Sequence, residues 1–201
     1  MGVSAAYFIE LEFQDTGSYV YRLYKASYGQ RATYVQFMPD RSRVVAGTNL
    51  EAGKQAFVEA FVQRPEFQAK YPISLNGTQF IDALLQTVMA GSGVDLSSLR
   101  STLINDFNAN QSRARILRIV ADDATFKQAE YNKAFVIMQY FGYLRRDPEE
   151  GGYLYWLDVL NNRVPGNFRG MVCAFLTSAE YQGRLSSIRT RTDQICGTIG
   201  P

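Results

Sequence analysis

The stretch 135–181 constrains the fold of this chain most, because its apolar residues recur at helical spacing. Its first part carries large side chains every three to four positions: Phe135, Val136, Tyr140 and Leu144. Residues at this spacing share one face of an α-helix and can bury it together. The stretch therefore predicts that it begins with a helix.

A second helix start follows at Asp147-Pro148-Glu149-Glu150. Asp is a favoured N-cap, Pro fits the first helical position, and acidic side chains complement the positive end of the helix dipole. We expect Asp147 to cap a helix that begins at Pro148. The apolar residues of that helix also share one face: Tyr153, Trp156, Leu157 and Leu160. Trp156 is therefore interpreted as a core residue, whose truncation to Ala would cost roughly 3–5 kcal/mol.

The rest of the stretch predicts two more helices. Turn-forming residues over 161–167 end the previous helix, and a third helix is expected over 168–176. Ser178 is the expected cap of a short helix through Tyr181. The buried residues of the third helix would be Met171, Val172 and Phe175.

Residues 135–184 resemble a bacterial family catalogued as domain of unknown function 4214. The resemblance rests on Leu-Arg-Arg-Asp-Pro-Glu-Glu-Gly-Gly, a Tyr-Trp pair and Phe-Leu-Thr-Ser-Ala-Glu-Tyr. The motif positions are Asp147, Pro148, Gly151, Trp156, Phe175, Ser178, Glu180 and Tyr181. The resemblance implies a helical module of secreted or surface-attached bacterial proteins, without catalytic residues. A weaker likeness, to the linker domains of phycobilisomes, is at the level of the fold and licenses no function.

Two fainter copies of this stretch precede it, which predicts three quasi-equivalent units over about 5–71, 78–131 and 134–184, followed by a tail over 185–201. The opening positions are Tyr19, Val20, Tyr24 and Tyr28, then Phe80, Ile81, Leu85 and Met89, then Phe135, Val136, Tyr140 and Leu144. The closing positions are Phe57, Val58, Phe61 and Phe67, then Ile116, Leu117, Val120 and Phe126, then Met171, Val172, Phe175 and Tyr181. We expect the units to superpose, with Tyr24, Leu85 and Tyr140 in equivalent buried sites.

The predicted fold class is all-α, in a single domain over 1–201 without significant sheet. Residues 5–14 alternate between apolar and polar as a strand does, but a lone strand would have no partner, so helix is favoured there. In the first unit, residues 34–40 replace the Asp-Pro turn and leave its middle degenerate.

Composition excludes several functional classes. The chain is 46% hydrophobic and 20% charged, as in an ordinary globular protein, and no apolar run reaches the roughly 18–20 residues of a membrane span. Its net charge of +2 comes from scattered basic residues, which predicts no nucleic-acid partner. The beginning Met-Gly-Val-Ser-Ala-Ala has no signal-peptide pattern, and we expect the chain to be a fragment of a longer exported precursor.

The only cysteines are Cys173 and Cys196. Two cysteines without any His cannot complete a zinc site. They are either free core thiols or a disulfide that ties the tail to the third unit. The resemblance implies export, which favours the disulfide.

The absence of His removes the usual general base and the commonest transition-metal ligand. Carboxylate pairs that could hydrolyse a glycoside are Asp122-Asp123, Glu149-Glu150 and Glu10/Glu12. Asp147, Glu149 and Glu150 could also bind calcium, although their spacing is not that of an EF-hand. Helix capping explains the carboxylates of 122–123 and 147–150 more simply, and neither a cofactor nor a metal is predicted.

Aromatic residues suggest a carbohydrate surface, because exposed rings can stack on sugars. The 13 Tyr and 13 Phe mostly occupy expected core positions. The tyrosines least explained by packing are Tyr21, Tyr34, Tyr143, Tyr153 and Tyr155. The sequence thus predicts a non-catalytic extracellular or cell-surface module for protein interaction, attachment or assembly, with other modules or its own copies as partners. Carbohydrate binding is the alternative, and a carboxylate-based hydrolase is a third reading.

Overall fold

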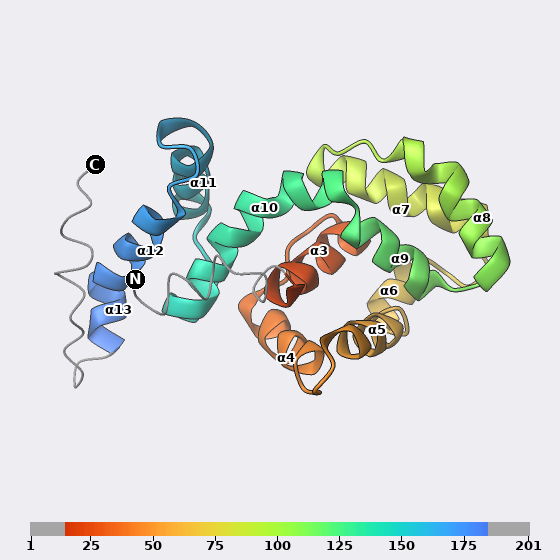
Figure 1. Cartoon of the computed structure of the whole chain (residues 1–201), viewed down its shortest axis with the longest axis horizontal. Coiled ribbons are helices and arrows are strands. Elements are labelled where there is room, and N and C mark those ends of the chain that lie inside the picture. Colours follow the sequence, from red (N-terminus) through yellow and green to blue (C-terminus); the bar gives the residue numbers. More distant parts are fainter. Residues whose placement is uncertain (1–14, 185–201) are drawn as a thin grey trace. The chain divides into compact units, whose positions relative to one another are not determined.

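The computed structural model describes residues 15–184, and within that range it contains helices and no β-strand (Figure 1). The predicted all-α fold class is confirmed. The expectation for residues 5–14 and the predicted tail over 185–201 lie outside the described residues.

The helices follow one another with short connections. They are α3 (Gly17–Tyr28), α4 (Tyr34–Val44), α5 (Leu50–Phe61), α6 (Pro65–Lys70), α7 (Gly77–Ser92), η1 (Ser97–Leu99), α8 (Arg100–Asn110), α9 (Arg113–Asp122), α10 (Ala124–Gln139), η2 (Tyr140–Leu144), α11 (Glu150–Asp158), η3 (Val159–Arg163), α12 (Phe168–Thr177) and α13 (Ala179–Arg184). Of these, η1 is a 3₁₀-helix, and η2 and η3 are π-helical continuations of α10 and α11.

The described residues divide into two bodies. The larger body contains residues 19–131, and the smaller body contains residues 15–18 and 132–184. Whether the chain is one domain stays a prediction.

In the larger body, α4 packs on α5, α5 on α9, and α8 on both α7 and α9 (Figure 1). Aromatic rings link α5, α6 and α7 in its core. The centroids of Phe61 and Phe67 lie 6.3 Å apart, those of Phe67 and Tyr71 4.8 Å, and those of Tyr71 and Phe80 5.4 Å. These contacts join the end of the first sequence unit to the start of the second.

Helix α3 is unusual because residues 19–27 are all buried, although several are polar. Burying a polar group is costly unless it finds a hydrogen-bond partner. The side chains of α3 find such partners on the surrounding helices: Tyr19 donates to Lys54 O, Tyr21 to Glu130, Arg22 to Ala121 O and Asp122, Tyr24 to Asp40, and Lys25 to Gly91 O. Helix α3 is thus a central helix bonded to α4, α5, α7, α9 and α10.

The smaller body confirms most of the helices expected near the C-terminal end. Helix α12 covers the range predicted for the third helix, and Met171, Val172 and Phe175 are buried. Ser178 Oγ accepts a hydrogen bond from Tyr181 N at 3.2 Å, so Ser178 caps α13 as predicted.

The predicted start of α11 is wrong. Its N-cap is Glu149, without a side-chain capping bond, and the helix begins at Glu150 rather than at Pro148. Arg146 explains the difference, because it donates to Asp147 O at 3.0 Å and pairs with Glu149 at 2.7 Å. These contacts stabilise an extended segment where the sequence predicted helix.

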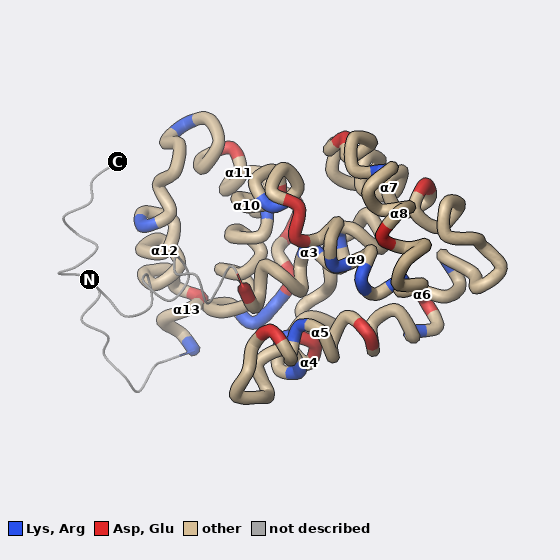
Figure 2. Tube along the Cα trace, turned by 45° about the vertical axis from the view of Figure 1, so that its right-hand side comes forward, with Lys and Arg blue, Asp and Glu red and all other residues tan. Residues whose placement is uncertain are grey.

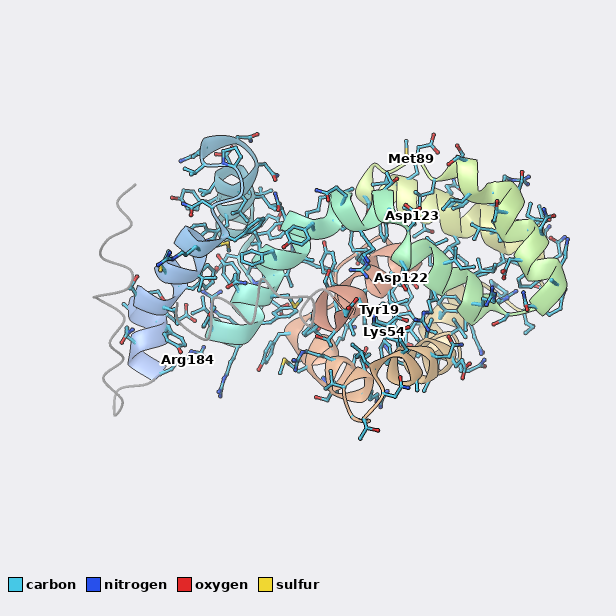
Figure 3. All side chains as sticks on the ribbon, in the orientation of Figure 1. Tyr19, Lys54, Met89, Asp122, Asp123 and Arg184 are labelled. Carbon is cyan, nitrogen blue, oxygen red and sulfur yellow. The ribbon has the colours of Figure 1, made fainter. Side chains whose placement is uncertain are left out.

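The positions aligned between the sequence units are mostly buried. Tyr24, Leu85 and Tyr140 are 6%, 8% and 5% exposed, as predicted. Tyr28 and Tyr181 are half-buried, and Met89 is exposed, at 52%, on α7 (Figure 3). It lies about 100° around the helix from the buried Val88, outside the apolar stripe. Superposition of the three units stays a prediction.

Candidate ligand pocket

A pocket of about 590 Å³ opens between α3, α4 and the start of α6, within the larger body. Two faces of α4 explain its position. Phe37, Asp40 and Val44 are buried against the body, whereas Gln36, Pro39 and Arg43 line the pocket. Because both sets recur at helical spacing, α4 presents one face to the core and an adjacent face to the pocket.

The floor of the pocket is a set of three hydrogen-bonded side chains, here called the Asp40 cluster: Tyr24, Asp40 and Arg64. Arg64 Nη2 and Nη1 donate to the two oxygens of Asp40 at 2.6 and 2.8 Å. The Tyr24 hydroxyl donates to Asp40 Oδ2 at 2.8 Å and accepts from Arg64 Nη1 at 2.9 Å. Bidentate pairing of this kind is strong and directional.

Packing also holds the Arg64 side chain in place. The guanidinium carbon lies 4.5 Å from the ring centroid of Phe61 and 5.5 Å from that of Phe57. Arginine over an aromatic face gains a cation–π interaction. Arg64 also precedes Pro65 and is the N-cap of α6, so its backbone is fixed as well.

The charge state of the Asp40 cluster follows from its surroundings. Burial lowers the pKa of the Arg64 guanidinium, but the hydrogen bonds and charge of Asp40 outweigh burial and raise that pKa above its usual value. Burial, and then the hydrogen bond and charge of Asp40, raise the pKa of the Tyr24 hydroxyl well above its usual value. At neutral pH Arg64 is therefore charged and Tyr24 keeps its proton.

Asp40 is consequently unsuited to catalysis. Both of its oxygens already accept hydrogen bonds from Arg64 or Tyr24, and its side chain is only 5% exposed. A general base must reach the proton that it removes. Asp40 is a structural anion that orients Arg64.

Other polar groups around the pocket are available to a ligand. Within residues 15–184, no hydrogen-bond partner is found for the hydroxyl of Tyr28 or for Gln36 Nε2, since the Gln36 oxygen is used in the capping box with Thr33. Arg43 is 65% exposed, and its ion pair with Asp40 is long at 3.9 Å. Burial raises the pKa of Tyr28 to about 12, so its hydroxyl is a donor at neutral pH.

The tyrosines expected to form a carbohydrate surface do not lie together on the described surface. Tyr21, Tyr143 and Tyr153 are 2%, 5% and 8% exposed, so they cannot stack on a sugar. Tyr34 is half-buried, and Tyr155, at 49%, is the one of the five that is exposed. A ligand surface that includes all five tyrosines is wrong, because Tyr21, Tyr143 and Tyr153 pack into the cores of their bodies.

The motif positions behind the family resemblance form a packed cluster in the smaller body. Arg146 pairs with Glu180 through two bonds of 2.8 Å each. Above this ion pair, Phe175 contacts Tyr140 at 5.0 Å and Trp156 at 5.7 Å between centroids. The remaining motif positions vary in burial: Pro148 is buried, Ser178, Tyr181 and Trp156 are half-buried, and Asp147 and Gly151 are exposed. Their arrangement explains the motif as packing and capping.

Two of the carboxylate pairs considered for hydrolysis have members held in ion pairs or in capping. Asp122 accepts from Arg22 at 3.1 Å and lies 3.6 Å from Arg118, and Asp123 Oδ1 accepts from Phe126 N at the start of α10. Tyr19, Lys54 and Asp122 lie close together at this junction of α3, α5 and α9 (Figure 3). Glu149 pairs with Arg146, and the pair at 10 and 12 lies outside the described residues.

No metal site emerges from the rest of the described chain. In residues 15–184 no group of three or more His, Cys, Asp or Glu side chains could hold a metal ion. The carboxylates at 147–150 therefore do not form such a group either. Basic and acidic positions are interspersed along the trace, with short runs of one sign (Figure 2). None of the described helices is long and apolar enough to cross a membrane.

Cys173 lies on α12, but Cys196 is outside the described residues, so their bridge stays a prediction.

The pocket itself was missed by the sequence analysis. Residues 34–40 were noted only as replacing the Asp-Pro turn in a degenerate unit, yet they form most of α4, with Pro39 inside the helix. A usable signal was present: Thr33 and Gln36 have the spacing of a capping box, and both capping hydrogen bonds are formed. Nothing in the local sequence around Asp40 or Arg64 indicated that these two side chains pair.

Comparison of the chain with family models, with curated proteins and with solved structures finds no match.

Proposed function

We propose that this chain is a non-catalytic binding module of an exported bacterial protein, and that it serves in attachment to, or assembly at, a cell surface. The observation that carries the proposal is the pocket over the Asp40 cluster. Its buried acid is neutralised by Arg64, and the groups left for a ligand on Tyr28, Gln36 and Arg43 are hydrogen-bond donors. Donors on a rigid floor suit recognition, whereas turnover needs an acid or base that exchanges protons.

The export part of the proposal is supported by the resemblance of residues 135–184 to a family of surface-protein modules. A disulfide between Cys173 and Cys196 is part of the same proposal, since disulfides persist outside the reducing cytosol. Neighbouring modules of a longer protein, or other copies of the chain, are the proposed protein partners.

Carbohydrate binding is a second candidate function, and it now rests on different residues. The ring of Tyr28 and the ring of Pro39 both line the pocket beside polar side chains. A few polar groups among apolar faces are typical of small-molecule sites.

Cosedimentation with cell envelopes of the source organism tests the proposed function. We expect the full chain to sediment with envelopes, and the double variant Tyr28→Phe/Arg43→Gln to lose most of that binding. Arg41→Gln is the matched control, because Arg41 is on the same helix but does not line the pocket. Equal sedimentation of the double variant, or no sedimentation of the wild type, would contradict the proposal. Release of sugar from chromogenic glycosides would contradict its non-catalytic part.

A further inference from the structure

We infer that the pocket over the Asp40 cluster binds a saccharide that carries a carboxylate, such as a uronic acid residue. The inference rests on the proposed function and deepens it by assigning a ligand class to the pocket.

The size of the pocket restricts the ligand to a small molecule or the end of a chain. Its volume of about 590 Å³ lies within the range of roughly 300–1,000 Å³ that small-molecule sites occupy. The pocket is open to solvent along α4, where Gln36, Pro39 and Arg43 are exposed. A ligand can therefore enter without movement of a helix and extend beyond the pocket.

The charges of the pocket favour a monoanion. Arg43 and Arg64 line it together with Asp40 and Glu66. Arg64 and Asp40 neutralise each other, so Arg43 is a cation on the solvent side of the floor. A carboxylate carries one negative charge, whereas a phosphate monoester carries nearly two and would also meet Glu66.

Arg43 is the residue that the geometry assigns to the carboxylate. Its contact with Asp40 joins Nη1 and Oδ1 at 3.9 Å, beyond hydrogen-bond distance. Its guanidinium can therefore donate to a ligand without giving up a short bond. A planar guanidinium matches a planar carboxylate with two parallel hydrogen bonds.

The remaining lining indicates a sugar rather than a simple organic acid. Tyr28 and Pro39 offer ring faces for the C–H face of a pyranose, and Tyr28 also carries a hydroxyl without an assigned partner in residues 15–184. The side-chain amide of Gln30 and the Nε2 of Gln36 can pair with sugar hydroxyls, which both donate and accept. A carboxylate alone would leave these groups unused.

Calorimetric titration of the full chain with a trigalacturonate tests this inference. The matched ligand is its methyl ester, which keeps the sugar rings and removes the charge. We expect the acid to bind and the ester to bind at least about tenfold more weakly, since hydrogen bonds to charged groups are the stronger ones. Binding of the acid should weaken as salt increases.

Variants assign the binding to the pocket. We expect Arg43→Gln to weaken trigalacturonate binding about tenfold, Tyr28→Phe to weaken it less, and Arg41→Gln to leave it unchanged. Thermal unfolding of each variant shows whether it is folded. Equal binding of acid and ester, no binding of the acid, or no effect of Arg43→Gln would overturn the inference. If acetate binds as tightly as the trisaccharide, the pocket does not recognise a sugar. If a sulfated trisaccharide binds more tightly than trigalacturonate, the carboxylate is not the group that the pocket prefers.

Competition separates this inference from the proposed function. If trigalacturonate releases the chain from envelopes, both stand. Sedimentation that trigalacturonate does not reverse overturns the ligand class alone, whereas binding of trigalacturonate without sedimentation overturns the surface role alone.

Discussion

Gly91 in α7 lies so close to Gly29, just after α3, that position 91 has no room for a side chain. A Cβ on Gly91 would lie 2.4 Å from the Cα of Gly29 and 2.5 Å from its carbonyl oxygen. Gly29 also has a φ of 73°, which disfavours other residues. Lys25 Nζ joins the two helices by donating to the carbonyl oxygens of Gly29 at 3.0 Å and Gly91 at 2.7 Å.

We predict that Gly91→Ala lowers the free energy of unfolding by about 1–3 kcal/mol, the usual cost of overpacking. The clash is with backbone, which cannot rotate away. Gly151→Ala is the matched control, because nothing lies within 4 Å of its Cβ position and it is in the first turn of α11. That control should stabilise the protein by about 0.4–1 kcal/mol. Urea denaturation measures both, and equal effects would contradict the contact.

Trp156 is less buried than its place on a helical stripe suggested. It is half-buried, and its ring lies 5.7 Å from Phe175 and 5.2 Å from the exposed Tyr155. We predict that Trp156→Ala costs about 2 kcal/mol, below the roughly 3–5 kcal/mol of a fully buried aromatic. An unchanged urea midpoint would show that the ring contributes nothing to the core.

At the scale of elements, α3 determines how the larger body is built. A helix buried on every side normally carries apolar residues alone. Here Arg22 is 2% exposed and donates to Ala121 O at 2.6 Å, while Tyr21 donates to Glu130 Oε2 at 2.8 Å. Each such bond fixes a neighbouring helix, because an unpaired buried polar group would cost about 1–3 kcal/mol.

Arg146 has the corresponding role in the smaller body, where it joins the segment before α11 to α13. The hydrogen bonds from Arg146 hold the pKa of Glu180 below its usual value and also lower that of Glu149. A carboxylate whose pKa is lowered by folding stabilises the protein above its unfolded pKa of about 4.3. This stabilisation is lost as the pH falls through the lower, folded pKa.

We predict that Arg146→Gln destabilises the protein at pH 7 and that its difference from wild type becomes smaller at pH 3. The reason is that protonated glutamates no longer pair with Arg146. Arg145→Gln is the control, since Arg145 is the exposed neighbour and carries the same charge. Urea midpoints at both pH values decide the matter. A difference that is the same at pH 3 and pH 7 would show that the ion pairs are not its cause.

At the scale of the whole molecule, the predicted Cys173–Cys196 bridge would join α12 to the C-terminal tail. In the chain-entropy model a loop of this size contributes about 3 kcal/mol. We predict that the unreduced protein under denaturing conditions shows no reactive thiol, and that reduction lowers its urea midpoint. Two reactive thiols would remove the bridge, and with it the residue-level argument for export.

Local signals in the sequence were enough to predict most helices. Periodic apolar residues placed α12 correctly, and Ser178 was found as a cap because its partner Tyr181 is three residues away. The start of α11 was misplaced, and there Arg146 binds not only Asp147 O and Glu149 but also Glu180, which is 34 residues away in the chain. A distant partner leaves no local pattern.

The sequence by itself determined that this chain is helical and which helix faces are apolar, since both depend on neighbours within a few residues. Only the tertiary structure decided which aromatic rings are buried and where a ligand can bind. Tyr24, Asp40 and Arg64 come from three different helix regions, and their hydrogen bonds exist only because packing around α3 brings these regions together. The pocket is a result of that packing. The spacing of residues along the chain does not predict it.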